Sequence, residues 1–209
     1  MWRGRLEEMS ETTDYFTLFG LARHLHVDVA ALEKAFYAQS RRLHPDRFAA
    51  KPAAEQEEAL AASSQLNDAY RTLREPIART EYLLGLEGIQ LEEQSRAATD
   101  AAKASGTAKK QVAPPDLLEE AFELNMQLEE MKMDPDPGVR AELEAAAAKF
   151  TAMLAETQVQ LEGLWTKWDA AVDAGDVAGK DAAKTAIVAL LNRRSYIRNL
   201  VRDVGQALE

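Results

Sequence analysis

The sequence predicts an all-α protein, with three helices in an N-terminal domain and a three-helix bundle in a C-terminal domain. Apolar side chains recur at the 3.6-residue period of amphipathic helices, and prolines and glycines separate the periodic segments. Residues 95–115 hold few large apolar side chains and end in two prolines, which is typical of a linker. We therefore expect an N-terminal extension at 1–13 that is either disordered or misassigned, and domains at 14–94 and 116–209. The segment between the domains is expected to be a linker or a weakly helical connection.

An amphipathic helix with a basic outer face is expected in the N-terminal domain. Before it, residues 14–21 predict core contacts rather than a long helix, through Tyr15, Leu18, Phe19 and Leu21. Asp28 is a residue type that caps helices, so the helix is expected to begin near Val29. Its core side carries Leu32, Phe36, Gln39 and Leu43, and its outer side carries Lys34, Tyr37, Arg41 and Arg42.

A rigid corner is expected where this helix ends, at His44, Pro45 and Asp46. The residue before a proline is disfavoured in the α region, and proline has no N–H to continue the helix. Asp46 is thereby held on a stiff turn beside the end of a basic helix. Because a carboxylate only accepts hydrogen bonds, Asp46 is suited to pair with an arginine of another protein.

Two more helices are expected to complete the N-terminal domain. One begins near Pro52 and is antiparallel to the basic helix, with a stripe of Ala59, Ala62, Leu66, Ala69, Tyr70 and Leu73. The other follows Pro76, is shorter, and carries Tyr82, Leu83, Leu84 and Leu86.

The C-terminal domain is expected to be helical throughout, with Asp116 capping its first helix and a break at 134–138. One apolar seam occupies positions 143, 147, 150, 154, 157, 161, 164 and 168, and a second occupies 187, 190, 194, 197, 201, 204 and 208. A reversal at 174–179 separates them, which predicts two long antiparallel helices with the first helix packed against both. Trp165 and Trp168 are expected in the core or at the end of the bundle.

Composition excludes several classes of function. The net charge of −10 opposes binding to nucleic acid or anionic membranes, and no run of 18 apolar residues occurs. Without cysteine the chain has no disulfide and no thiolate metal site, and it has no glycine-rich phosphate loop. We expect a cytoplasmic protein with no metal and no cofactor, in which His24 and His26 are solvated or at the core edge.

The segment KAFYAQSRRLHPDRF, with NDAYRTL in the next helix, resembles the J domain, by which co-chaperones stimulate the ATPase of a DnaK-class chaperone. The resemblance implies a three-helix J domain with a C-terminal extension, in which Asp46 engages an arginine of the ATPase. The implied chaperone-binding residues are Lys34, Arg41, Arg42, His44, Pro45, Asp46 and Arg47. Exposed ion pairs contribute about 0.2 to 1 kcal/mol each, so this contact is expected to be weak and salt-sensitive. Taken singly, the same residues also fit a solvated face and a helix terminator.

Two further segments narrow the resemblance to the HscB family, the J-type co-chaperones of iron–sulfur cluster biogenesis. They are DYFTLFGL at 14–21 and PIARTEYLLGLEG at 76–88, and an acidic and apolar helix opens the C-terminal bundle, as in that family. This helix has one apolar stripe for the bundle, at Leu117, Ala121, Leu124, Leu128 and Met131. A second apolar stripe lies about 100° around the helix and consists of Leu118, Phe122 and Met126. It predicts a second binding partner, unless packing in the bundle itself requires a wide apolar stripe.

The resemblance implies that the second stripe binds an IscU-like scaffold protein, which is delivered to an HscA-like chaperone. The implied scaffold-binding residues are Leu118, Glu119, Phe122, Glu123, Met126, Glu130 and Tyr196. Glu119 stands where the family often has methionine, and Met126 stands where it often has an acid, an exchange that leaves the composition of the patch similar. Three alternatives remain: a J-domain adaptor for a different client, an enzyme that uses His44 as an acid or base, and a purely structural helical spacer.

Overall fold

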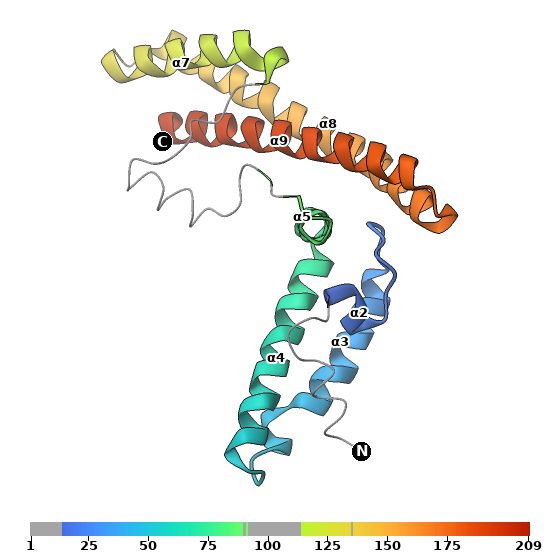
Figure 1. The fold of residues 1–209 in the computed structure, drawn as a ribbon. Coiled ribbons are helices and arrows are strands. Elements are labelled where there is room, and N and C mark those ends of the chain that lie inside the picture. The colour runs from blue at the N-terminus through green and yellow to red at the C-terminus, as the bar shows by residue number, and fades with distance from the viewer. Residues whose placement is uncertain (1–13, 90, 92–113, 135) are drawn as a thin grey trace. The chain divides into compact units, whose positions relative to one another are not determined.

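The computed structural model describes residues 14–89, 91, 114–134 and 136–209, and every regular element in them is helical (Figure 1). The all-α prediction is confirmed for this part of the chain. The predicted extension at 1–13 and nearly all of the linker at 95–115 lie outside the described residues. No helix in the described part combines the length and apolar character needed to cross a membrane.

The described residues divide into two compact units. The first unit contains the residues up to Ile89 together with Trp165–Val177, and the second contains Gln90–Leu164 and Ala178–Glu209. The predicted domain ranges, 14–94 and 116–209, stay predictions. The first unit adds to the N-terminal residues a short stretch of the C-terminal half, which the sequence did not predict.

Two antiparallel helices dominate the N-terminal part of the first unit (Figure 1). The elements are α2 (Tyr15–Phe19), α3 (Val29–Leu43), the 3₁₀ turn η1 (Pro45–Arg47), α4 (Ala53–Arg74) and α5 (Pro76–Leu86). Asp28 caps α3 as expected, because its Oδ1 accepts a hydrogen bond from the Ala31 N–H at 3.0 Å. A core cluster joins α3 and α4 through Leu43, Ala62 and Leu66, with Leu18, Phe19 and Phe36 packed against it.

The short helix α2 corrects one detail of the predicted core. Phe16, which the sequence analysis left out of the core, is fully buried, whereas Tyr15 is half-buried and stacks on Tyr82 with ring centroids 4.3 Å apart. Asp14 caps α2 through its side chain, and Gly20 at φ +67° ends it. The five-residue helix therefore turns Phe16 toward the core.

Three helices contribute to the second unit, apart from the stretch Trp165–Val177 at the α8–α9 reversal, and they surround one apolar cluster. They are α7 (Leu118–Met133), α8 (Pro137–Ala174) and α9 (Val177–Leu208), and the 3₁₀ turn η2 (Pro115–Leu117) precedes them. The break at 134–136 and the reversal at Gly175, with φ +65°, fall where the sequence predicted them. The cluster contains Leu117, Leu124, Val139, Leu143, Phe150, Ile197, Leu200 and Val204.

Asp116 does not cap α7, contrary to the prediction. The N-cap position is Leu117, which makes no side-chain cap hydrogen bond, because the chain enters α7 through η2. The Asp116 carboxylate instead accepts from Arg193 of α9, with Nη2 and Oδ2 2.8 Å apart. This ion pair fastens the start of α7 to α9 within the second unit.

Candidate functional site

The corner after α3 holds the candidate chaperone-binding carboxylate. His44 leaves the helix with ψ 132°, the extended conformation expected before a proline, and its carbonyl accepts from the Arg47 N–H at 3.0 Å. The side chain of Asp46 is 90% exposed, and its contact with His44 Nδ1 is long, at 3.4 Å. Asp46 thus presents an almost unengaged carboxylate on a backbone turn that the sequence fixes.

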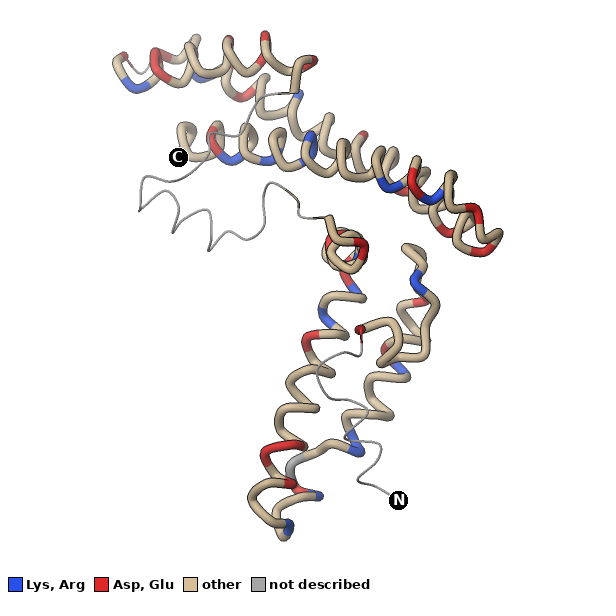
Figure 2. Tube along the Cα trace, in the orientation of Figure 1, with Lys and Arg blue, Asp and Glu red and all other residues tan. Residues whose placement is uncertain are grey.

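The outer face of α3 supplies positive charge beside this corner. Figure 2 shows the basic positions along α3 and at η1. Lys34, Arg41, Arg42 and Arg47 are all exposed, and within the described part of the chain no ion pair engages them. Arg47 Nη1 lies 3.4 Å from the Arg41 carbonyl oxygen, which keeps these two residues together. The arrangement can recognise a partner surface that carries carboxylates and an accessible arginine.

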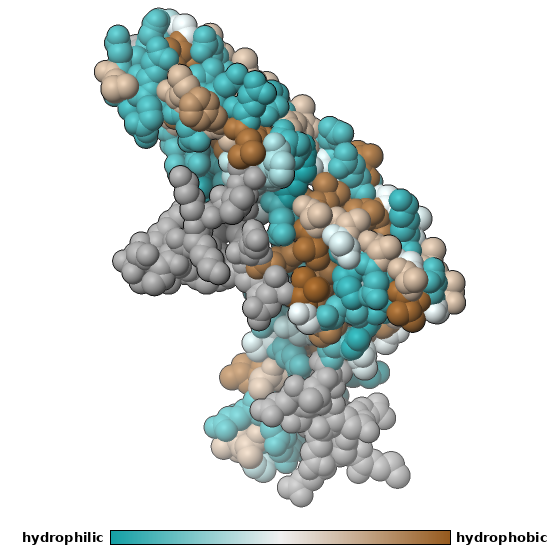
Figure 3. Space-filling view, turned by 45° about the horizontal axis from the view of Figure 1, so that its top comes forward, coloured by the Kyte–Doolittle hydropathy of each residue, from teal (hydrophilic) through white to brown (hydrophobic). Residues whose placement is uncertain are grey.

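A strip of exposed apolar side chains runs along α7, and we call Leu118, Phe122 and Met126 the α7 strip. Their exposures are 55%, 67% and 59%, whereas Ala121 and Leu124 on the bundle side are buried. Apolar atoms stand among hydrophilic ones over this helix in the space-filling view (Figure 3). Because α7 buries its other stripe in the bundle, the wide-stripe alternative does not account for the α7 strip.

Acidic side chains border the α7 strip. Glu119, Glu123 and Glu130 are exposed, and Figure 2 colours the acidic positions along α7. Met133, which the sequence analysis did not single out, continues the strip seven residues after Met126 and is 81% exposed. The seven-residue spacing from Met126 places Met133 on the same side of the helix, although the DPDPG break follows it directly.

Tyr196 of α9 is half-buried and packs against the cluster of the second unit. Burial, and secondarily the charge of Asp203, raise the pKa of its phenol above the ordinary value, so it is neutral at physiological pH. Arg193, one turn earlier on α9, pairs with Asp116 immediately before α7. This pairing supports the placement of Tyr196 near the start of the α7 strip, and its role stays a prediction.

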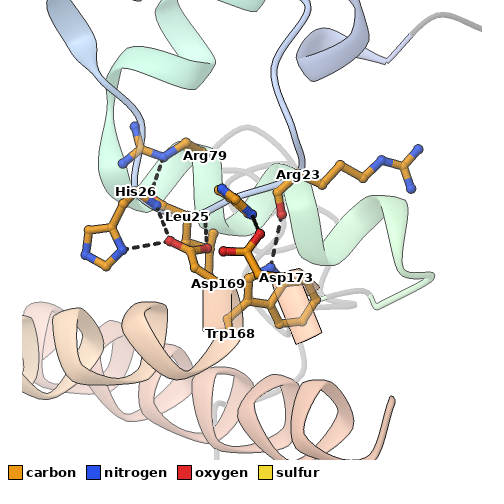
Figure 4. A network of polar contacts seen from close by, with 8 residues as sticks. Arg23, Leu25, His26, Arg79, Trp168, Asp169 and Asp173 are labelled. Atoms are coloured by element: carbon orange, nitrogen blue, oxygen red, sulfur yellow. Dashed lines mark hydrogen bonds and ion pairs between the residues drawn. The ribbon is translucent and has the colours of Figure 1, made fainter. Parts of the chain in front are cut away.

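The first unit also contains a polar network that sequence reasoning missed (Figure 4). The Asp169 carboxylate, on the last turns of α8, accepts from the backbone N–H of Leu25 at 2.6 Å and of His26 at 2.9 Å. It also contacts His26 Nδ1 at 2.8 Å. Trp168 Nε1 donates to the Arg23 carbonyl oxygen at 3.2 Å. Residues 23–26, which lead into α3, are therefore held by side chains from the end of α8.

Two more side chains complete this network. Arg79 of α5 is 4% exposed and donates through Nε to the Leu25 carbonyl oxygen at 2.8 Å. Burial lowers the pKa of its guanidinium, and the charge of Asp169 partly offsets that effect. His24 Nε2 lies 2.9 Å from Asp173 Oδ1. His24 is half-buried and His26 is exposed, which agrees with the expectation that they are solvated or at the core edge. The described residues contain no cluster of three or more side chains suited to a metal ion.

Comparisons with known proteins concern the chain as a whole. The co-chaperone protein HscB homologs of two Vibrio cholerae serotype O1 strains are each 35% identical over 162 residues, which cover 77% of this chain and 85% of theirs. The solved structure of chaperone HscB from Vibrio cholerae matches with a TM-score of 0.57 and 29% identity, over 93% of this chain and 96% of that one. Human co-chaperone HscB matches in fold, with a TM-score of 0.56, 23% identity and coverage of 94% and 83%. No protein-family model matches the chain.

The helical fold and these relatives define the class of protein as a co-chaperone. The identity of 35% over most of the length of both chains narrows the class from co-chaperones in general to one family. The chain belongs to the HscB family of co-chaperones.

Proposed function

We propose that this chain is a non-enzymatic co-chaperone of iron–sulfur cluster assembly. It binds an IscU-like scaffold protein through the α7 strip and stimulates the ATPase of an HscA-like, DnaK-class chaperone through the corner at Asp46. Membership of the HscB family supports the class of function. One observation carries the two site assignments: a carboxylate that is 90% exposed and an apolar strip with Phe122 67% exposed are both open to solvent.

The corner is proposed to act on the chaperone by charge. An arginine of the ATPase pairs with the Asp46 carboxylate, and Arg41 and Arg42 steer the encounter with an acidic surface. ATP binding and hydrolysis take place in the chaperone, so this chain supplies no catalytic residue. Because the client and the stimulating corner belong to one molecule, the effective concentration of client at the chaperone rises.

Steady-state ATPase measurements of a DnaK-class chaperone, with and without scaffold protein, test both assignments. His44→Gln and Asp46→Asn are expected to abolish stimulation and leave the affinity for the scaffold protein unchanged. Phe122→Ala is expected to keep basal stimulation and to lose scaffold binding. Stimulation by Asp46→Asn at the wild-type level would refute docking through the corner.

A second candidate function is a J-domain adaptor for a different client. The specific observation in its favour is that Glu119 and Met126, where this chain departs from the usual family pattern, are both exposed beside Phe122. Retained ATPase stimulation together with absent binding to the scaffold protein would select this alternative.

A further inference from the structure

A groove of about 290 Å³ lies between α7 and α8 in the second unit. Apolar side chains line its floor: the methyl groups of Ala145 and Ala146 provide accessible surface, and Leu124 and Phe150, each 2% exposed, lie beneath. The groove therefore offers contact to an aliphatic chain.

The rim of the groove is polar and predominantly acidic. It consists of Glu120, Glu123 and Gln127 from α7 and Glu142 and Lys149 from α8. Three carboxylates and one ammonium give the rim a formal charge of −2. Lys149 Nζ lies 3.5 Å from Glu120 Oε1, and Gln127 donates to Glu142 at 3.1 Å. Both bridges are solvent-exposed, and the contact between Lys149 and Glu120 is long, so an incoming cation competes with them easily.

The groove is continuous with the α7 strip. Successive residues of a helix are rotated by about 100°. Going around α7, the α7 strip is therefore followed by the acid row, Glu119, Glu123 and Glu130, and then by the rim of the groove. Glu123 belongs to both the acid row and the rim, and within the described residues no ion pair engages it. A partner that covers the strip and the acid row therefore reaches the groove.

We propose that this groove binds one basic side chain, lysine or arginine, of the scaffold protein. The aliphatic stem lies on Ala145 and Ala146, above the covered side chains of Leu124 and Phe150. The cationic head lies between Glu123 and Glu142. Long basic side chains combine an apolar stem with a charged head, which matches an apolar floor under an acidic rim. This inference rests on the proposed scaffold binding through the α7 strip.

Charge reversal at Glu142 tests the groove, because Glu142 lies on α8 and outside the strip. We expect Glu142→Lys to weaken binding of the purified scaffold protein about 10-fold in isothermal titration calorimetry with the full chain, through loss of a charge partner and repulsion. The matched control is Glu144→Lys, which makes the same change two residues away outside the groove, and its affinity is expected within about two-fold of wild type.

A second pair of variants fills the groove without changing its charge. Ala145→Leu places bulk over the apolar floor and is expected to weaken binding about five-fold, whereas Ala148→Leu, on exposed α8 surface outside the groove, is not. Phe122→Ala separates this inference from the proposed function. If Phe122→Ala binds like wild type, scaffold binding through the strip has failed. If Phe122→Ala weakens binding while Glu142→Lys and Ala145→Leu match their controls, the groove alone is overturned.

Discussion

The corner and the α7 strip differ in what holds their binding atoms in place. At the corner, the backbone turn between His44 and Arg47 positions one charged group, and almost no side-chain contact supports it. On α7, burial of Ala121 and Leu124 fixes the helix and leaves an apolar face outward. A charged group contributes direction and association rate, whereas apolar area contributes affinity. Substitutions on the α7 strip are therefore expected to change the free energy of scaffold binding more than loss of the α3 charges changes the free energy of chaperone binding.

The largest effect is expected from removal of the α7 strip. Burial of Leu118 and Phe122 on a partner contributes about 1.5 to 3 kcal/mol each before association costs. Leu118→Ala combined with Phe122→Ala should weaken scaffold binding on the order of 100-fold, which calorimetric titration measures directly. Both side chains are exposed, so the melting temperature should stay within about 2 °C of wild type.

Val159→Ala is the matched control for this double variant. Val159 is 69% exposed on α8 in the same unit and lies outside the strip. Its replacement removes apolar surface of the same kind and should leave the scaffold affinity unchanged. Equal losses from the control and the double variant would show that the strip has no special role.

The second largest effect is expected on the stability of the first unit, which contains the corner but not the α7 strip. Asp169→Ala leaves the N–H groups of Leu25 and His26 without their acceptor, and Leu25 is 1% exposed. An unsatisfied buried donor costs about 1 to 3 kcal/mol, so the first unit should lose roughly 2 to 3 kcal/mol. Hydrogen exchange at the Leu25 and His26 amides should rise, and ATPase stimulation should fall at temperatures near the shifted melting point, while scaffold affinity is retained.

Asp173→Ala provides the comparison for Asp169→Ala. Asp173 is 69% exposed and contacts only the His24 ring among the contacts that the structure shows for it. Its removal should cost less than about 1 kcal/mol and leave amide exchange at Leu25 unchanged. Similar protection in the Asp169 variant and in wild type would mean that residues 23–26 do not depend on α8.

The corner and the α7 strip could be predicted from local sequence, whereas the polar network of Figure 4 could not. His44 is extended because Pro45 follows it, and Phe122 lies outward because it is one residue out of phase with the core stripe. Asp169, by contrast, meets His26 across 143 residues of sequence. No local pattern reports a contact of that length, and the apolar period of α8 assigned the neighbouring Trp168 to the bundle seam, whereas it lies in the first unit.

Local sequence also gave the wrong contacts for side chains at the ends of two helices. Asp116 has the side chain of a helix cap, but Pro114 and Pro115 start a 3₁₀ turn before α7, and Arg193 engages the carboxylate. Tyr15 was expected in the core and Phe16 was not, whereas Phe16 is fully buried and Tyr15 is half-buried, because the short helix α2 turns Phe16 inward. Element type was therefore predictable, and the direction of single side chains at element ends was not.

A smaller effect is expected from the charges beside the corner. Arg41 and Arg42 are exposed, so each contributes about 0.2 to 1 kcal/mol to an encounter with an acidic surface. Arg41→Ala combined with Arg42→Ala should raise the concentration of co-chaperone needed for half-maximal ATPase stimulation about five-fold at low salt. The difference should shrink as salt is added. Arg71→Ala, an exposed charge near the end of α4, is the control, and an equal shift there would point to net charge rather than to α3.

The smallest expected effect concerns acid stability of the first unit, where Asp14 pairs with Arg23 at 2.8 Å. Burial raises the pKa of this carboxyl, but hydrogen bonds from Arg23 and Thr17 outweigh that effect and hold it below the ordinary value. A depressed folded-state pKa contributes stability that is present above the unfolded-state value, near pH 4, and is lost as the pH falls through the folded-state value. Asp14→Asn keeps an oxygen that caps α2 and removes the charge, so it should lower stability by less than about 1 kcal/mol at pH 7. Thermal melts of the two proteins should converge in strong acid, and a constant difference at every pH would assign the loss to the cap rather than to the ion pair.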